Sequence, residues 1–145
     1  MYETIVVGAD GSETAKRAVA EATRLAAATG GTLHLVYAYE SARGARVVGA
    51  PEGAAKVWDV RPDTMAESIL EQAAALVRMR DVGVETHALK GDPADALLTV
   101  AKREEAGLIV VGNRGMHGVS RVLGSVPNKV SHHARCNVLI VTTEE

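Results

Sequence analysis

The segment with the most suggestive chemistry is a glycine-rich loop near the end of the chain. An apolar run is followed there by "GNRGMHGVSRVLGS", residues 112–125. Gly112, Gly115 and Gly124 let backbone N–H groups approach an anion closely, because no Cβ stands in the way. Ser125 lies where a helix is expected to begin, so its hydroxyl and the following N–H groups can meet a negative charge at the positive end of the helix dipole. The pattern predicts a phosphate-binding loop.

Two well-known phosphate loops do not match this segment. A P-loop requires Gly-x-x-x-x-Gly-Lys-[Ser/Thr], whereas five residues separate Gly118 from Gly124 and no lysine precedes Ser125. A dinucleotide fingerprint requires Gly-x-Gly-x-x-Gly directly after the first strand, where this chain has "VGADGSE". A Walker-type nucleotide hydrolase and a nicotinamide or flavin dehydrogenase are both disfavoured.

Short apolar runs predict the strands that position this loop. They are rich in Val, Ile, Leu, Thr and Tyr and are bounded by Gly, Asp or Asn. Runs such as "IVV" and "LIVV" do not alternate polar with apolar residues, as is typical of strands buried on both faces. The predicted strands are residues 4–8, 32–39, 84–90, 108–112 and 137–143.

Four helices are predicted between the strands. The first has Ser12 as its N-cap and stops at Gly30-Gly31, where glycine favours a helix end. The second begins at "TMAE", whose Thr64 and Glu67 have the spacing of a capping box.

The third and fourth helices follow later strands. The third opens with Asp92 as N-cap and Pro93 at the first helical position, and runs to Gly107. The fourth is short, from near Ser125 to near Ala134.

The strict alternation of strands and helices predicts the fold class. Right-handed crossovers place helices on both faces of a doubly wound, five-stranded parallel sheet in the α/β class, here one domain over residues 1–145. Ligands of such sheets bind at the carboxyl ends of the strands, where the strand order reverses. If the first and fourth strands are neighbours there, "GADGS" (8–12) and the glycine-rich loop converge.

The connection at 40–62 is unusually long and is either a lid or a surface insertion.

The composition argues against nucleic acid and membranes as binding partners. The net charge of −2 and the scarcity of aromatic residues give neither a basic face nor a stacking platform for nucleic acid. No stretch approaches the ~18 apolar residues of a membrane span, and the amino terminus lacks a signal-peptide pattern. The single cysteine, Cys136, suits a reducing compartment, so a cytoplasmic location is expected, without nucleic acid or membrane.

Several side chains have both a functional and a structural interpretation. Asp10 can contact a ligand or cap the turn before the first helix. Arg114 and Arg121 can meet phosphate charge or remain solvated, and His117 is more simply explained as an exposed loop residue. The adjacent pair 132–133 points in different directions on a helix, so no metal ligand is assigned.

Catalytic groups are sparse around the predicted phosphate loop. The loop contains no Asp or Glu, and no nucleophile–base pair follows from the spacing. Phosphoryl transfer needs metal-binding carboxylates and a base or positioned water. Asp10 alone would provide too few of these groups for efficient catalysis. We expect binding with at most slow ATP hydrolysis, and assign no catalytic residue.

Cys136, ahead of a buried strand, is interpreted as a packed, inert residue.

"VVGADGSETAKRAV" at the start and "VVGNRGMHGVSRVLGSVPNKVSHHARCNVLIV" at the end make this chain resemble the universal stress protein family over essentially its whole length. The nucleotide-binding branch of that family carries Gly-x2-Gly-x9-Gly-[Ser/Thr]. Gly112, Gly115, Gly124 and Ser125 fill this motif, with eight rather than nine residues between the second and third glycines. The resemblance implies a Rossmann-like fold of the adenine nucleotide alpha hydrolase-like type.

The resemblance also implies roles for individual residues. One group lies against the nucleoside, a second walls the adenine, a third flanks the ribose and a fourth holds phosphates through backbone N–H groups and a hydroxyl. The nucleoside group is Gly8, Ala9 and Asp10, and the adenine group is Val36 and Val111. The ribose group is Gly112 and Arg114, and the phosphate group is Gly115, Gly124, Ser125 and Val126.

The implied function is that of a regulatory, ATP-binding module of the stress response, with magnesium as a companion of ATP. Cyclic AMP or AMP in the same pocket, or slow ATP hydrolysis, are the alternatives. A homodimer through the C-terminal strand 137–143 is expected as well, because an apolar edge strand is a hazard unless it is covered.

Overall fold

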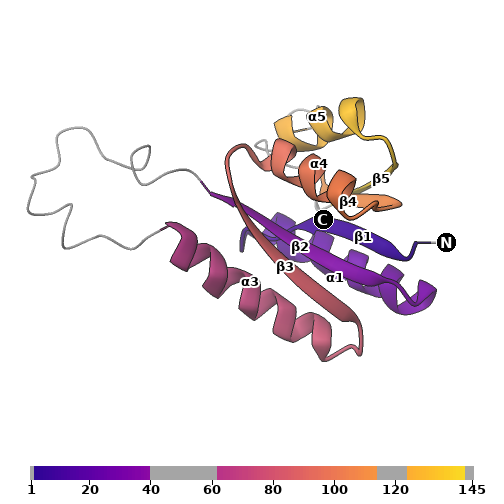
Figure 1. Ribbon diagram of the computed structural model, residues 1–145. Coiled ribbons are helices and arrows are strands. Elements are labelled where there is room, and N and C mark those ends of the chain that lie inside the picture. The colour runs from indigo at the N-terminus through magenta and orange to yellow at the C-terminus, as the bar shows by residue number, and fades with distance from the viewer. Residues whose placement is uncertain (1, 40–61, 114–123, 143–145) are drawn as a thin grey trace, which may run out of the picture.

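The fold is built on one sheet, in the computed structural model that describes residues 2–39, 62–113 and 124–142. Its strands are β1 (Thr4–Gly8), β2 (Thr32–Tyr39), β3 (Gly83–Lys90), β4 (Leu108–Gly112) and β5 (Asn137–Val141). All pairings are parallel, in the order β3-β2-β1-β4-β5 (Figure 1). The predicted fold class is confirmed. Three strands have the predicted bounds, β3 begins one residue earlier, and β5 ends at Val141 instead of continuing to 143.

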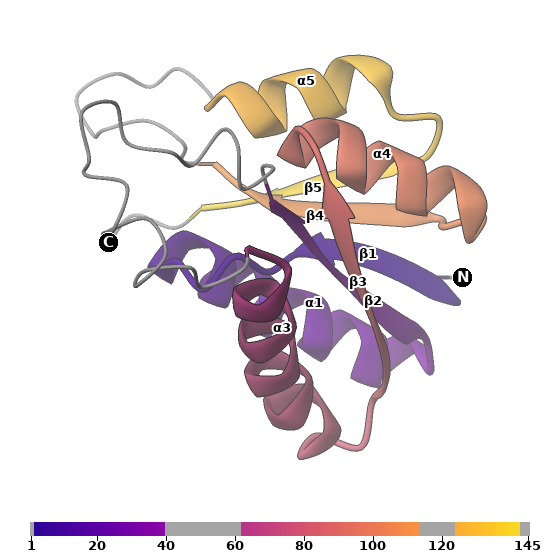
Figure 2. The ribbon, with the colours of Figure 1, turned by 60° about the vertical axis from the view of Figure 1, so that its left-hand side comes forward.

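Helices cover both faces of this sheet. The helices are α1 (Glu13–Thr29), α3 (Pro62–Arg78), α4 (Pro93–Arg103) and α5 (Ser125–His133). α1 and α3 pack on one face, and α4 and α5 on the other (Figure 2). Successive residues of a strand point to opposite faces, so Ile5 and Val7 belong to the first layer and Val6 to the second, all without solvent exposure. This explains why the run "IVV" shows no polar alternation.

Three helix ends confirm the capping predictions. Ser12 Oγ accepts a hydrogen bond from Ala15 N at 3.1 Å and caps α1. Gly30 ends α1 with φ 73°, the left-handed conformation that glycine adopts without a steric penalty. Asp92 accepts from Asp95 N at 3.0 Å and caps α4, directly before Pro93.

Two predicted helix bounds were wrong. α3 begins at Pro62, two residues before Thr64, so the expected capping-box threonine lies inside the first turn; the fixed φ of proline suits a first turn. α4 ends at Arg103, not at Gly107. Glu105 takes φ 53°, and the N–H of the next residue, Ala106, returns to the carbonyl of Ala101 at 2.9 Å, which closes the helix.

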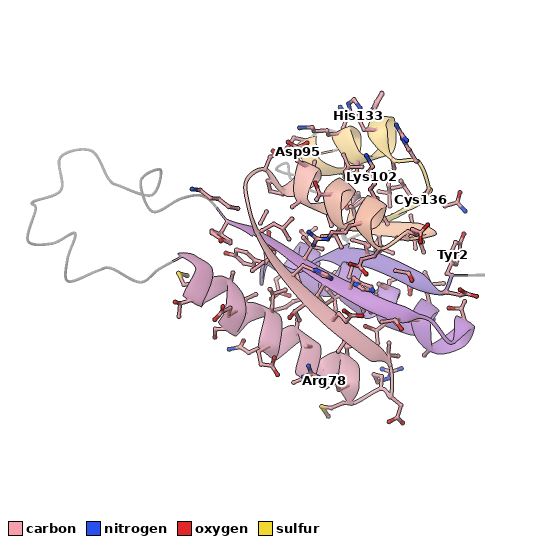
Figure 3. All side chains as sticks on the ribbon, in the orientation of Figure 1. Tyr2, Arg78, Asp95, Lys102, His133 and Cys136 are labelled. Atoms are coloured by element: carbon pink, nitrogen blue, oxygen red, sulfur yellow. The ribbon has the colours of Figure 1, made fainter. Side chains whose placement is uncertain are left out.

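Charged side chains lie on the outer surfaces of the helices. Arg78 on α3 and Lys102 on α4 are exposed (Figure 3). No helix among the described residues is long and apolar enough to cross a membrane. Residues 40–61, most of the connection interpreted as either a lid or an insertion, lie outside the described part of the chain.

The two edges of the sheet differ in character. β3 has exposed and half-buried residues and no buried one, and Glu85 and Lys90 are among its exposed positions. β5 has half-buried apolar residues on both faces, from Val138 to Val141. The C-terminal strand is therefore an edge strand, as predicted, and it is the more apolar edge.

Candidate functional site

A pocket of about 470 Å³ lies where the strand order reverses. β1 pairs with β4, with Val7 opposite Val110, so the first and fourth strands are neighbours, which is the condition under which the two loops were expected to converge. The chain continues from β1 toward β2 on one side and from β4 toward β5 on the other. Both connections leave the carboxyl ends of the strands, which opens the crevice expected in sheets of this type.

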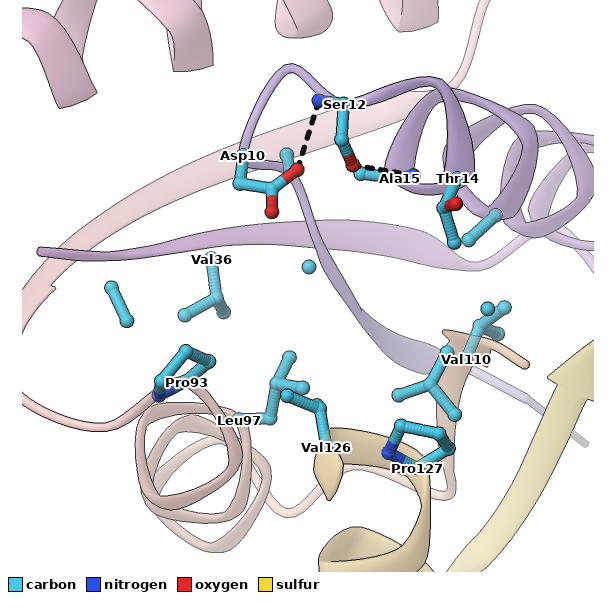
Figure 4. Close-up of a pocket in the computed structure, with 16 residues that line it drawn as sticks. Asp10, Ser12, Thr14, Ala15, Val36, Pro93, Leu97, Val110, Val126 and Pro127 are labelled. Atoms are coloured by element: carbon cyan, nitrogen blue, oxygen red, sulfur yellow. Dashed lines mark hydrogen bonds between the residues drawn. The ribbon is translucent and has the colours of Figure 1, made fainter. Parts of the chain in front are cut away.

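One side of the pocket is apolar and the other carries polar groups (Figure 4). The polar side is the β1–α1 turn with the start of α1. The apolar side comes from the ends of β2 and β4, the start of α4 and the start of α5. The described lining residues are Gly8, Ala9, Asp10, Ser12, Thr14, Ala15 and Ala18 on the first side, and Val36, Ala38, Pro93, Leu97, Val110, Val111, Gly112, Val126 and Pro127 on the second.

The β1–α1 turn fixes the one charged group of the described lining. Asp10 Oδ1 accepts a hydrogen bond from Ser12 N at 2.9 Å, and Ser12 in turn caps α1. Gly11 between them has φ 84°, which favours glycine. The second carboxylate oxygen of Asp10 points into the pocket (Figure 4). One oxygen of Asp10 therefore stabilises the turn, as the capping interpretation expects, and the other faces the pocket.

The start of α5 closes the other end of the pocket. Gly124 N donates to Asn113 O at 3.2 Å, so the two ends of the glycine-rich segment meet. Gly124 is also the N-cap of α5 and provides no side-chain cap. Because Pro127 has no N–H, the first turn can offer a ligand the N–H groups of Ser125 and Val126. This is the arrangement by which a helix start binds an anion.

The predicted site residues fall into three groups. Gly8, Ala9, Asp10, Val36, Val111, Gly112 and Val126 line the pocket. Gly124 and Ser125 are outside the lining but directly precede Val126 in the chain. Arg114 and Gly115 lie outside the described residues, as do His117 and Arg121.

Sequence reasoning missed most of the apolar side of the pocket. Pro93 and Leu97 begin α4, and Pro127 follows Val126 in α5, yet none was assigned to the site. Pro93 was recognised as a helix start; its position after the third strand could have placed it at the same edge of the sheet. Ala38 on this side, and Thr14 on the polar side, belong to no motif that could have pointed to them.

The remaining candidates are structural. Cys136 is half-buried, and burial raises the pKa of its thiol, which agrees with a packed, unreactive residue. His132 Nδ1 lies 2.8 Å from Asn128 O within α5. In the described part of the chain, no three His, Cys, Asp or Glu side chains gather as metal ligands would.

Comparison with known proteins decides the family. The model of the universal stress protein family matches residues 1–142. The chain belongs to the universal stress protein family. A universal stress protein of Mycobacterium tuberculosis (strain H37Rv) is 38% identical, with 98% of this chain and 97% of the relative covered. One from Thermus aquaticus is 40% identical, with 97% and 99% covered.

A solved structure extends this membership to the three-dimensional fold. A universal stress protein crystallised in complex with cAMP is 33% identical, has a TM-score of 0.76, and is matched over 99% of this chain and 98% of its own. The resemblance drawn from the two glycine-bearing segments is thereby confirmed. The pocket described above occupies the crevice of a universal stress protein fold.

Proposed function

We propose that this universal stress protein binds an adenine nucleotide in the pocket between β1 and β4, and that occupancy regulates its interactions in the stress response. One observation carries the proposal: the β1–α1 turn and the start of α5, which bear the two segments with the binding motifs, enclose the same pocket. Its volume of about 470 Å³ lies within the range typical of small-molecule sites.

The two sides of the pocket suit the parts of a nucleotide. Val36, Val111 and Leu97 provide an apolar surface for the base. The free oxygen of Asp10 can accept a hydrogen bond from the nucleoside. The first turn of α5 provides N–H groups for phosphate.

ATP is the first expected ligand, and magnesium would arrive with it. Asp10 is the only acidic residue in the described lining. A single carboxylate does not make a dedicated cation site, whereas Mg²⁺ commonly binds through phosphates and few protein ligands. Cyclic AMP is the second candidate, favoured by the 33% identical relative that was crystallised with it.

The alternative to a binding module is an enzyme, a slow ATPase. The described lining offers one carboxylate and no histidine, so a hydrolytic water would have few partners. Turnover well above background that is abolished by Asp10→Ala would favour the enzyme. Turnover at background level supports a binding module.

The decisive experiment compares two glycine substitutions in strands. A Cβ at Gly8 would meet Leu97 Cδ2 at 3.9 Å and Val36 O at 4.0 Å, which are ordinary contacts within the pocket wall. Gly8→Val should therefore fold while filling the pocket. Gly83→Val is the matched control, since its Cβ would contact Thr32, away from the pocket lining.

Calorimetry and thermal unfolding with ATP, AMP and cyclic AMP, each with and without magnesium, provide the measurement. A ligand at ~100 times its Kd should stabilise the wild type and Gly83→Val by ~2.7 kcal/mol. Gly8→Val should lose this response, and so should Gly115→Val in the loop. A wild type that binds none of the three nucleotides contradicts the proposal.

We further propose a homodimer formed through β5, supported by the apolar character of this edge strand.

The single cysteine of the chain supports a reducing, cytoplasmic location. Fractionation of cells that express the tagged chain tests the location.

A further inference from the structure

Lys129 joins the two helices whose first turns form one side of the pocket. Its Nζ lies 2.9 Å from Asp95 Oδ1 and 3.4 Å from Asp92 Oδ2. Lys129 belongs to α5, whereas Asp92 is the N-cap of α4 and Asp95 lies in its first turn. One ammonium group therefore bridges two carboxylates of the neighbouring helix.

This bridge lies close behind the pocket wall without being part of it. Pro93 of α4 and Val126 of α5 line the pocket; Pro93 directly follows Asp92, and Val126 lies three residues before Lys129. Lys129 itself is not a lining residue. Lys129 therefore makes no direct contact with the pocket, and its ion pairs are with α4.

α5 is a short helix with two fully buried residues. The helix has nine residues, of which Pro127 and Val130 are buried, and its N-cap makes no side-chain hydrogen bond. Helices this short are marginal in isolation and depend on tertiary contacts. The bridge is a polar contact that ties α5 to the first turn of α4, beside the end that faces the pocket.

The charges of the bridge are mutually stabilised. The hydrogen bond to Asp95 raises the pKa of Lys129, and the two carboxylate charges act in the same direction. The pKa of Asp92 is lowered, first by the N–H of Asp95 and then by Lys129. The ammonium group is thus engaged with α4 and not directed at a ligand.

We propose that Lys129 is a positioning residue for the nucleotide, which holds the first turn of α5 against α4 so that the N–H groups of Ser125 and Val126 face the phosphate. This inference rests on the proposed function and makes it more specific. Lys129 governs the phosphate end of the pocket, whereas the base and ribose meet β1, β2 and β4. Its loss should weaken ligands that carry phosphate and leave the nucleoside largely unaffected.

Calorimetry with AMP and with adenosine tests this division. Lys129→Met should weaken AMP binding by about threefold, as expected for exposed ion pairs, and change adenosine binding by less. Lys129→Arg, which retains the charge and the donors, should restore AMP affinity. Lys102→Met, at an exposed lysine of α4 outside the pocket lining, is the matched control and should bind both ligands as the wild type does.

The outcomes separate the inference from the proposed function. Equal weakening of AMP and adenosine by Lys129→Met, or unchanged AMP affinity, overturns the positioning role and leaves nucleotide binding intact. A wild type that binds neither ligand overturns the proposed function itself. If Lys129→Met unfolds, as judged by circular dichroism, Asp95→Ala removes the shorter contact from the other side and should give the same selective loss.

Discussion

At the scale of single residues, Asp10 both stabilises a turn and faces the pocket. One oxygen holds the β1–α1 turn through Ser12 N, and the other points into the pocket. Asp10→Asn keeps an oxygen for the turn and removes the charge. Hydrogen bonds to charged groups contribute about 1.5–3 kcal/mol, so nucleotide affinity should fall about tenfold or more.

Isothermal titration calorimetry measures this loss, with Glu13→Gln as the control at an exposed position of the same turn region. Nucleotide affinity equal to that of the wild type would show that the free oxygen of Asp10 makes no contact with the ligand. A collapse of thermal stability would show instead that the amide cannot replace the carboxylate in the turn.

At the scale of secondary structure elements, a histidine pair connects β2 and β3. His34 Nδ1 lies 2.9 Å from His87 Nε2, and His34 is 3% exposed. Burial, His34 and the nearby Arg103 lower the pKa of His87 from 6.5, in that order, while Glu104 and Glu85 oppose them weakly. No sequence pattern singled out this pair, because parallel register brings together residues 53 positions apart.

The lowered pKa of His87 makes stability depend on pH. Below about pH 6.5 the unfolded chain binds a proton that the folded chain resists. Stability should therefore be fully present above pH 6.5 and should decrease as the pH falls toward the folded pKa. Urea unfolding at pH 7.5, 6.0 and 5.0 measures this trend, and His87→Gln should flatten it. An unchanged slope in that variant would assign the acid sensitivity to other groups.

The elements also show which features the sequence could predict. Strands such as 4–8 and 108–112 were predicted accurately because they are apolar on both faces and end at glycine. Ser12 and Asp92 were recognisable because helix capping is a local interaction. Val36 and Val111 were predicted on the apolar side of the pocket, but Pro93, Leu97 and Pro127 were missed, because their position depends on how α4 and α5 pack beside β4, which no local pattern encodes.

At the scale of the whole molecule, the edge strand β5 determines the expected assembly. Val138 and Ile140 pack toward α4 and α5, while Leu139 and Val141 face the other layer. Ile140 is half-buried, so Ile140→Lys should shift the proposed dimer toward monomer by placing a charge against a second β5, and circular dichroism checks that the variant keeps its fold. Analytical ultracentrifugation at micromolar concentration measures this shift, with Thr86→Lys on β3 as the control. A wild type that sediments as a monomer contradicts the β5 interface.

The unlike edges of the sheet also limit how far molecules can add to one another. At β3, the exposed Glu85 and Lys90 would have to give up their hydration before another strand could pair there. Two copies joined through β5 would then present only β3 edges to the outside. Association would stop at a closed pair, because neither outer edge favours extension into a filament.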